Sequence, residues 1–419
     1  MSQLPPTSLA FSLLQAARVV AAVVAGRSLA EGLLARVPGA ARPAVQDLVY
    51  GTLRSFGQGD FVLARLLERP LTEPEVRALL LVALQRLATR PEAAHTVVDQ
   101  AVAAAGEIAG GYLRGLVNGV LRNYLRRQPE LRAALADDPL ARSAHPDWWL
   151  RELQGAYPEA WPDIVAAGNS APPMALRVNC RRCTRDDYLR QLADAGIAAW
   201  PLGEVGLLLV RPVPVERLPG FADGLVSVQD PGAQRAAELL DPAPGSRVLD
   251  ACAAPGGKAA HLLERTDLDL LALDLKAARC RRVEENFARL HLGAQVLTAD
   301  CARPDSWWDG RPFDAVLADV PCTASGVVRR NPDAKWLRRA SDIDGFAAAQ
   351  ARILDALWQV VRPGGKLLYA TCSVFPAENG DQIAAFLDRR PDARRCHEEQ
   401  LLPNAEHDGF YYCLLDKRA

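Results

Sequence analysis

Two cysteines follow predicted strands in the C-terminal half of the chain, where they could act as nucleophiles. Cys322 ends the run Asp319-Val320-Pro321-Cys322, and Cys372 lies in Thr371-Cys372-Ser373. A thiolate is the strongest nucleophile that a protein offers near neutral pH. These residue types therefore predict group transfer onto an electrophilic carbon.

A glycine-containing loop, Asp250-Ala251-Cys252-Ala253-Ala254-Pro255-Gly256-Gly257-Lys258, precedes both cysteines and opens a predicted helix. Gly256 and Gly257 would let the backbone approach a ligand at the helix N-terminus. The loop matches neither GxGxxG nor GxxxxGK[ST], so a classical dinucleotide or P-loop site is weakly supported. The residues expected to contact a nucleotide-like cofactor are Cys252, Ala253, Ala254, Pro255, Gly256, Gly257 and Lys258.

Strands and helices alternate from about Asp230 onward, which predicts a doubly wound, mainly parallel sheet. Such sheets bind ligands beyond the carboxyl ends of their strands. The residues at those ends are Asp250, Asp274, Asp300, Asp319 and Thr371-Cys372. Asp274 is placed to accept hydrogen bonds from ribose hydroxyls, and Asp300 could contact an adenine amino group, although strand-end acids also serve as helix caps. With the glycine loop, they predict a nucleoside-shaped pocket suited to S-adenosylmethionine.

A basic stretch, Gly326 to Arg339, follows the first cysteine. Its candidate nucleic-acid contacts are Arg329, Arg330, Lys335 and Trp336, where an indole stands among cations. Cations bind the phosphate backbone and an aromatic ring can stack on a base, so we expect RNA contacts here. A basic surface loop without RNA is the alternative. Lysine makes up only five of the 49 basic residues, which draws attention to those inside motifs.

The organisation of the chain changes twice. Residues 1–140 show helical periodicity, residues 141–225 read as a small α+β module, and residues 226–419 form the α/β domain. The net charge of −1 means that nucleic-acid binding must use local patches. Nine cysteines in a long chain favour a reducing cytoplasm over a disulfide framework. No membrane span is expected. No metal site is expected either, because Cys180 and Cys183 lack a second pair of ligands. Nothing in the sequence requires more than a monomer.

These motifs resemble those of the RNA cytosine-5 methyltransferases. The resemblance rests on Asp250–Lys258, on Asp319–Cys322 with Arg329–Trp336, and on Tyr369–Ser373. The segments Tyr50–Arg54 and Val117–Asn123 are similar to the NusB fold. Together they resemble the 16S ribosomal RNA branch of the family, which implies an all-α NusB-like RNA-binding domain, an α+β RNA-positioning module and a Rossmann-like methyltransferase domain that uses S-adenosylmethionine. One departure is Thr323-Ala324-Ser325-Gly326, where the family more often has Ser-Gly-Xaa-Gly.

The resemblance also implies roles for three residues. Cys372 would attack carbon 6 of a cytosine in 16S ribosomal RNA, Asp319 would hold and protonate ring nitrogen 3 and also border the cofactor, and Cys322 would release the enzyme from the RNA. The residues alone do not order the two cysteines, because DNA methyltransferases use the cysteine that follows proline. A transfer-RNA substrate, a DNA substrate and a non-catalytic RNA-binding scaffold remain the alternatives.

Overall fold

The computed structural model describes residues 4–418 and divides into two compact units. The first unit runs to Ser170 and also contains Val328–Arg339, whereas the second comprises Ala171–Val327 and the chain from Ala340 onward. The boundary predicted between residues 140 and 141 does not separate the units, because helices α8 (Asp147–Ala156) and α9 (Trp161–Asn169) belong to the first.

The first unit is entirely helical in its described residues, as predicted. Its longer helices are α1 (Leu9–Val24), α2 (Arg42–Arg54), α3 (Phe56–Leu66), α4 (Pro74–Thr89), α5 (Ala94–Ala105), α6 (Arg114–Asp137), α7 (Pro139–Ser143), α8, α9 and α14 (Ala334–Leu337). Short 3-10 turns are η1 (Leu29–Glu31), η2 (Leu33–Arg36), η3 (Pro91–Ala93) and η4 (Ala109–Gly111). Helix α1 buries Leu13, Ala17 and Val20 in the core, and no described helix is long and apolar enough to span a membrane.

The segment Val328–Arg339 is anchored inside the helical unit. Asp333 accepts hydrogen bonds from the Ser28 hydroxyl and the Leu29 backbone N–H, both at 2.9 Å. The Trp336 indole donates to the Leu53 carbonyl at 2.7 Å and lies against the Phe56 ring. These contacts show that a stretch interrupting the α/β domain in sequence is part of the helical core.

Two of the four residues expected to contact RNA, Arg329 and Lys335, do not lie at the surface of the helical unit. Arg329 is 1% exposed, and Lys335 is fully buried. The Lys335 ammonium donates to the carbonyls of Arg54 (3.0 Å) and Ala144 (3.1 Å) and to Asn169 Oδ1 (2.7 Å). The carbonyl of Arg54 belongs to the last residue of α2, where unpaired helix carbonyls attract a cation. Lys335 therefore closes a helix end, and its hydrogen bonds are directed into the protein.

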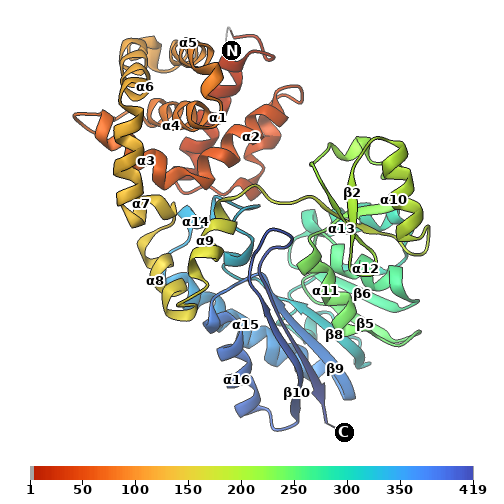
Figure 1. Cartoon of the computed structure of the whole chain (residues 1–419). Coiled ribbons are helices and arrows are strands. Elements are labelled where there is room, and N and C mark those ends of the chain that lie inside the picture. The colour runs from red at the N-terminus through yellow and green to blue at the C-terminus, as the bar shows by residue number, and fades with distance from the viewer. Residues whose placement is uncertain (1–3, 419) are drawn as a thin grey trace. The chain divides into compact units, whose positions relative to one another are not determined.

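The second unit contains two sheets (Figure 1). The smaller one is antiparallel, with the order β2-β3-β1-β4. Its strands are β1 (Ala175–Val178), β2 (Ala199–Leu202), β3 (Gly206–Leu209) and β4 (Val226–Val228), with helix α10 (Arg185–Asp194) and turn η5 (Val215–Arg217). This sheet is the core of the predicted α+β module.

The larger sheet has the order β10-β11-β9-β8-β5-β6-β7, with parallel pairing from β9 to β7. Its strands are β5 (Arg247–Asp250), β6 (Asp269–Asp274), β7 (Gln295–Thr298), β8 (Phe313–Asp319), β9 (Val361–Thr371), β10 (Ala393–Leu401) and β11 (Phe410–Lys417). The helices are α11 (Pro231–Leu240), α12 (Gly257–Arg265), α13 (Ala277–Leu290), α15 (Ser341–Val360) and α16 (Gly380–Arg389), with turns η6 (Pro304–Ser306), η7 (Ser325–Val327) and η8 (Pro376–Glu378). The doubly wound sheet is confirmed.

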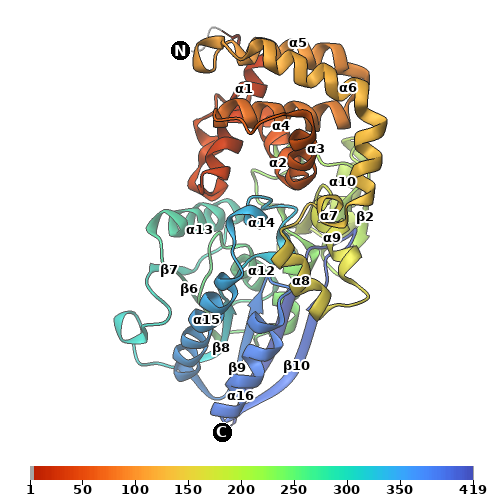
Figure 2. The same cartoon turned by 90° about the vertical axis from the view of Figure 1, so that its left-hand side faces the viewer.

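Helices cover both faces of this large sheet. Successive side chains of a strand point to opposite faces, so neighbouring residues of one strand pack in different cores. In β8, Val316 packs in the core formed with α15 and α16, and Leu317 packs in the core formed with α11, α12 and α13. Figure 2 shows α15 and α16 beside each other against the sheet. The edge strand β10 was not predicted, because its charged sequence, Ala-Arg-Arg-Cys-His-Glu-Glu-Gln-Leu, suits a partly solvated edge and lacks an apolar alternation.

Lys335 gives the helical unit a distinctive dependence on pH. Burial, with Arg54 nearby, lowers the pKa of Lys335 to about 7. Between pH 7 and about pH 10 the unfolded chain binds more protons at this lysine than the folded unit does, so stability rises with pH in that window. The Lys335→Met variant lacks this contribution. We expect the stability difference between wild type and variant to grow by about 2 kcal/mol from pH 7 to pH 9.

The measurement is a urea titration read by hydrogen exchange on peptides of α2 and α14. Lys276→Met, which removes an exposed lysine, is the matched control and should show no such growth. A Lys335→Met difference that stays constant with pH would contradict the lowered pKa of the buried Lys335.

Candidate active site

The pairing of β8 with β9 brings the two cysteine-bearing segments together. The strands are parallel and in register, with Asp319 opposite Ala370. Residues that follow these partners therefore leave the same edge of the sheet side by side. The sulfur atoms of Cys322 and Cys372 lie 3.3 Å apart, within hydrogen-bond range for thiols. The sequence predicted a common edge, and the structure adds that the two sulfurs are in contact.

The two thiols have different surroundings. Cys322 is buried, whereas Cys372 is partly exposed. The hydrogen bond with Cys372, reinforced by burial, raises the pKa of Cys322 well above its ordinary value. Cys322 therefore stays a protonated thiol and can donate its hydrogen bond to the Cys372 sulfur. Cys372 is the more accessible of the two sulfurs.

An ion pair lies at the same edge. Lys258 Nζ is 2.5 Å from Asp319 Oδ2, and both side chains are largely shielded from solvent. Burial disfavours the Lys258 ammonium, but the charges of Asp319 and then Cys372 outweigh burial and raise the pKa of Lys258. Lys258 thus links the glycine loop to the strand-end acid. Its contact with Asp319 was not predicted, because the two residues are far apart in sequence.

Asp250, at the end of β5, is a buried acid whose carboxylate lies near Lys258 but forms no hydrogen bond of normal geometry. It is 1% exposed, and neither of its carboxylate oxygens has a hydrogen-bond partner within residues 4–418. Burial, with the nearby Asp319 charge, raises the pKa of Asp250 to about 7, against the effect of Lys258. A buried acid with open acceptor positions at the rim of a sheet is suited to a ligand donor or cation.

The glycine loop has the shape of a cradle. Gly256 has φ of 95° and is the N-cap of α12, and a Cβ there would lie 3.1 Å from Val283 Cγ1. The Ala253 backbone N–H donates to the Leu273 carbonyl at 2.8 Å, which ties the loop to β6. The sulfur of Cys252 lies 3.7 Å from that of Cys301. The loop is therefore held closely against α13 and β6 at the N-terminus of α12.

The two other strand-end acids are engaged in local hydrogen bonds. Asp274 is buried and accepts from the backbone N–H of Ala254 (3.3 Å) and of Lys276 (3.1 Å), with Arg279 at 3.4 Å. Asp300 lies two residues beyond the end of β7, not at its last residue as predicted, and accepts from the Ala302 N–H at 3.0 Å. Both carboxylates border the loop region and retain acceptor capacity, since each oxygen has two lone pairs.

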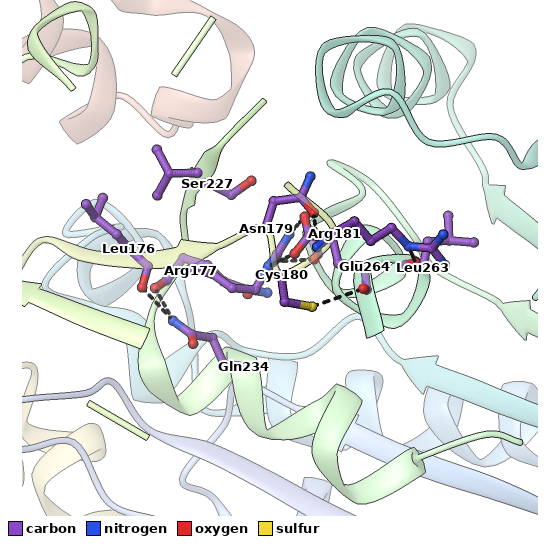
Figure 3. A network of polar contacts seen from close by, with 12 residues as sticks. Leu176, Arg177, Asn179, Cys180, Arg181, Ser227, Gln234, Leu263 and Glu264 are labelled. Carbon is purple, nitrogen blue, oxygen red and sulfur yellow. Dashed lines mark hydrogen bonds and ion pairs between the residues drawn. The ribbon is translucent and has the colours of Figure 1, made fainter. Parts of the chain in front are cut away.

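The small sheet holds α12 from outside the large sheet (Figure 3). Arg177 of β1 is fully buried and binds Glu264 through two parallel contacts of 2.7 and 2.8 Å. The same guanidinium donates to the Gly257 carbonyl at 2.7 Å, directly beside the cradle. Arg181 and the Cys180 thiol donate to the carbonyls of Leu263 and Glu264 near the end of α12. One arginine thus fixes both ends of the helix that opens at the candidate cofactor site.

Sequence reasoning missed a group of buried polar residues behind the cysteines. Glu378, Gln350, Thr323, Ser325 and Ser373 form a hydrogen-bonded cluster with almost no exposure. A weak signal was present, because a hydroxyl-bearing residue directly follows each cysteine, Thr323 after Cys322 and Ser373 after Cys372. It was not recognised because a lone glutamate in a 3-10 turn looks like an ordinary surface residue.

The departure at Ala324 has a structural consequence. Ala324 adopts φ of 62°, the left-handed region in which glycine, common in the family at this place, is free of strain. The Gly326 N–H still donates to the Cys372 carbonyl at 2.9 Å. The loop therefore keeps its path with alanine at the strained position.

The fold and this site together define a Rossmann-like methyltransferase. Three family models match the chain: NusB over residues 10–126, the ferredoxin-like domain of RsmF/B-like methyltransferases over residues 145–216, and 16S rRNA methyltransferase RsmB/F over residues 237–416. The chain is 45% identical over 428 aligned residues to ribosomal RNA small subunit methyltransferase B of Pseudomonas putida, covering 97% of this chain and 98% of the relative.

Two further proteins agree. The protein of the same description from Vibrio cholerae is 46% identical, with 89% of each chain covered. A solved structure described as PH0851 has a TM-score of 0.81 at 22% identity, covering 99% of this chain and 100% of its own, which supports the fold. The chain belongs to the RsmB/F family of 16S rRNA methyltransferases.

Asp250 provides a pH test of the cofactor-free site. Its folded pKa of about 7 exceeds the ordinary carboxyl value, so from about pH 4 to pH 7 the folded protein binds more protons than the unfolded chain. Stability contributed by this group is present below pH 4 and is lost as pH rises through 7. Asp250→Asn removes the ionisation, so wild type should lose about 3 kcal/mol relative to the variant between pH 5 and pH 8.

Urea unfolding read on peptides of β5 and α12, without cofactor, measures this difference. Asp305→Asn, in an exposed turn of the same unit, is the control. Equal stability differences at both pH values would show that Asp250 ionises normally.

Proposed function

We propose that this protein transfers a methyl group from S-adenosylmethionine to carbon 5 of a cytosine in 16S ribosomal RNA. The carrying observation is the pair of sulfur atoms 3.3 Å apart at the strand edge that also holds the Lys258–Asp319 ion pair. One thiol can add to the ring while the other remains a proton donor beside it. The family relationship supports the ribosomal RNA substrate.

The residues around the glycine loop fit the cofactor. The buried carboxylate of Asp250, which lacks a hydrogen bond of normal geometry, matches a cationic ligand, and Gly256 lets the loop pack closely against Val283 at the N-terminus of α12. Asp274 and Asp300 would accept hydrogen bonds from the nucleoside. When bound, S-adenosylmethionine supplies an electrophilic methyl group. Cys252 and Cys301 support the loop by packing.

The chain's own groups would carry the remaining chemistry. The Cys372 thiolate adds to carbon 6 of cytosine, which places electron density on carbon 5 and makes it a nucleophile. Asp319 holds ring nitrogen 3 and delivers a proton, and Lys258, 2.5 Å away, can replace that proton. After water accepts the proton of carbon 5, the carbon–sulfur bond breaks and ring nitrogen 3 returns its proton to Asp319. The Cys322 thiol then protonates the departing Cys372 thiolate. The protonated state of Cys322 supports this order of roles.

The remaining parts of the proposal concern the substrate and its setting. Cytosine must leave its stack to reach a thiol, so the target is single-stranded or splayed RNA. The three matched regions support separate helical, ferredoxin-like and catalytic domains, the first two positioning RNA. All nine cysteines are free in the described chain, and residues 4–418 contain no group suited to a metal ion. We propose a cytoplasmic monomer.

Methyl transfer to unmodified 16S RNA tests the function directly. The RNA is incubated with protein and S-adenosylmethionine, digested, and its nucleosides are identified by mass spectrometry. Formation of 5-methylcytidine is expected. Its appearance in transfer RNA alone would favour the transfer-RNA alternative, and absence of both methylation and cofactor binding would favour a non-catalytic scaffold.

Replacing Cys372 and replacing Cys322 should have different effects on the covalent RNA adduct. Cys372→Ala removes the nucleophile, so we expect no methylation and no covalent RNA adduct. Cys322→Ala leaves attack intact and removes the proton donor, so an RNA–protein adduct should accumulate on a denaturing gel. An adduct formed by Cys372→Ala would reverse the assignment.

A further inference from the structure

One buried carboxylate joins the two segments that carry the cysteines. Glu378 of η8 is fully buried. Its Oε1 accepts from the Thr323 backbone N–H at 2.9 Å and from Gln350 Nε2 at 3.1 Å. Its Oε2 accepts from the hydroxyls of Thr323 and Ser373, both at 2.5 Å. Four donors thus fill the four acceptor positions that a carboxylate offers.

The partners of Glu378 are the immediate neighbours of the cysteines in sequence. Thr323 follows Cys322, and Ser373 follows Cys372. Each neighbour is bound to the same carboxylate, so the backbone at both cysteines is fixed to one point. Hydrogen bonds to an ionised acceptor are about twice as strong as neutral ones, which makes this point rigid. No other pair of residues flanking the sulfurs shares a single charged partner in the described chain.

A second set of hydrogen bonds closes the same cluster. Ser325 Oγ accepts from the Val374 N–H at 2.8 Å and lies 2.9 Å from Ser373 Oγ. Asn379, next to Glu378, donates to the Ser373 carbonyl at 2.9 Å and accepts from the Thr371 hydroxyl at 2.6 Å. The loop after β8 and the loop after β9 are therefore held to each other on their buried side.

We propose that Glu378 is a positioning residue that sets the separation of the Cys322 and Cys372 sulfurs. For catalysis this inference rests on the proposed function, because the separation decides how readily Cys322 protonates Cys372 during release. Glu378 does not touch the reacting atoms. It acts through Thr323 and Ser373, whose positions determine where the two thiols point.

Glu378→Gln tests the role with almost no change in shape. The amide keeps one acceptor oxygen and presents an NH2 group in place of the other, so two of the four donors to Glu378 lose their acceptor. A direct measure of sulfur separation is the rate at which Cys322 and Cys372 form a disulfide with diamide. In that reaction the two thiols lose two protons and two electrons, and diamide accepts both and is reduced to its hydrazine. Peptide mapping identifies the pair that has closed.

The chain supplies its own internal control. The Cys252–Cys301 pair, with sulfurs 3.7 Å apart, lies in the same unit and lacks contact with Glu378. We expect Glu378→Gln to change the closure rate of Cys322–Cys372 by at least about tenfold and to leave Cys252–Cys301 closure unchanged. The matched control Glu399→Gln, which removes a partly exposed carboxylate paired with Arg235, should alter neither rate. Equal rates in wild type and Glu378→Gln would overturn the proposal, and so would equal slowing of both pairs.

Variants of the partners separate positioning from simple loss of folding. Thr323→Ser keeps both hydrogen bonds to Glu378 and should retain the wild-type closure rate, whereas Thr323→Val removes the hydroxyl and should reproduce part of the Glu378→Gln effect. If Glu378→Gln does not fold, the comparison of Thr323→Ser with Thr323→Val tests the proposal instead. Matching closure rates for serine and valine would refute the role.

Catalysis gives the second readout. Glu378→Gln should reduce kcat for RNA methylation by up to about 100-fold, with KM for S-adenosylmethionine unchanged, because displacing a reacting group by about 1 Å has effects of that size. The covalently trapped fraction of enzyme should rise as well. A raised KM with unchanged kcat would contradict positioning of the thiols. The diamide experiment needs neither RNA nor cofactor, so failure of the proposed methylation would leave its result intact.

Discussion

Parallel, in-register pairing of β8 with β9 is the constraint on which the site depends. Asp319 stands opposite Ala370, so the chain leaves both strands at the same level and in the same direction. Two loops that are distant in sequence must then run beside each other. Their contact at the sulfur atoms, and the buried cluster beneath it, follow from this register. A shift of one residue would turn Asp319 to the opposite face and separate it from Lys258.

Charged side chains gather at this edge of the sheet, an arrangement that suits ligand binding more than it stabilises the fold. Asp250 is buried without a hydrogen bond of normal geometry, and the Lys258 ammonium interacts with the charges of Asp319 and Cys372. Burying such groups is unfavourable unless something compensates them. The surrounding structure supplies rigidity, with Arg177 fixing α12 at its start and near its end. The small sheet therefore supports the cofactor cradle as well as contributing its own fold.

The sequence predicted the fold and the edge of the site more successfully than the interior contacts. Strands such as β5 and β8 are apolar runs that end in acids, so the strands and their carboxyl ends can be recognised in the sequence. The doubly wound sheet was predicted from the alternation of such strands with helices. The same reasoning did not predict the burial of Lys335 and Glu378. Both are charged residues in short turns, where local pattern predicts exposure, and only tertiary packing places their partners around them. The contact of Lys258 with Asp319 likewise depends on the sheet order.

The most direct test of the account is to identify which sulfur carries the RNA. An RNA substrate with 5-fluorocytosine at the methylated position should trap the covalent adduct, because fluorine at carbon 5 cannot leave as a proton does. Protease digestion and mass spectrometry then locate the modified cysteine. The account predicts the nucleotide on Cys372, with Cys322 a free thiol. A nucleotide on Cys322 would contradict the assignment of the two cysteines.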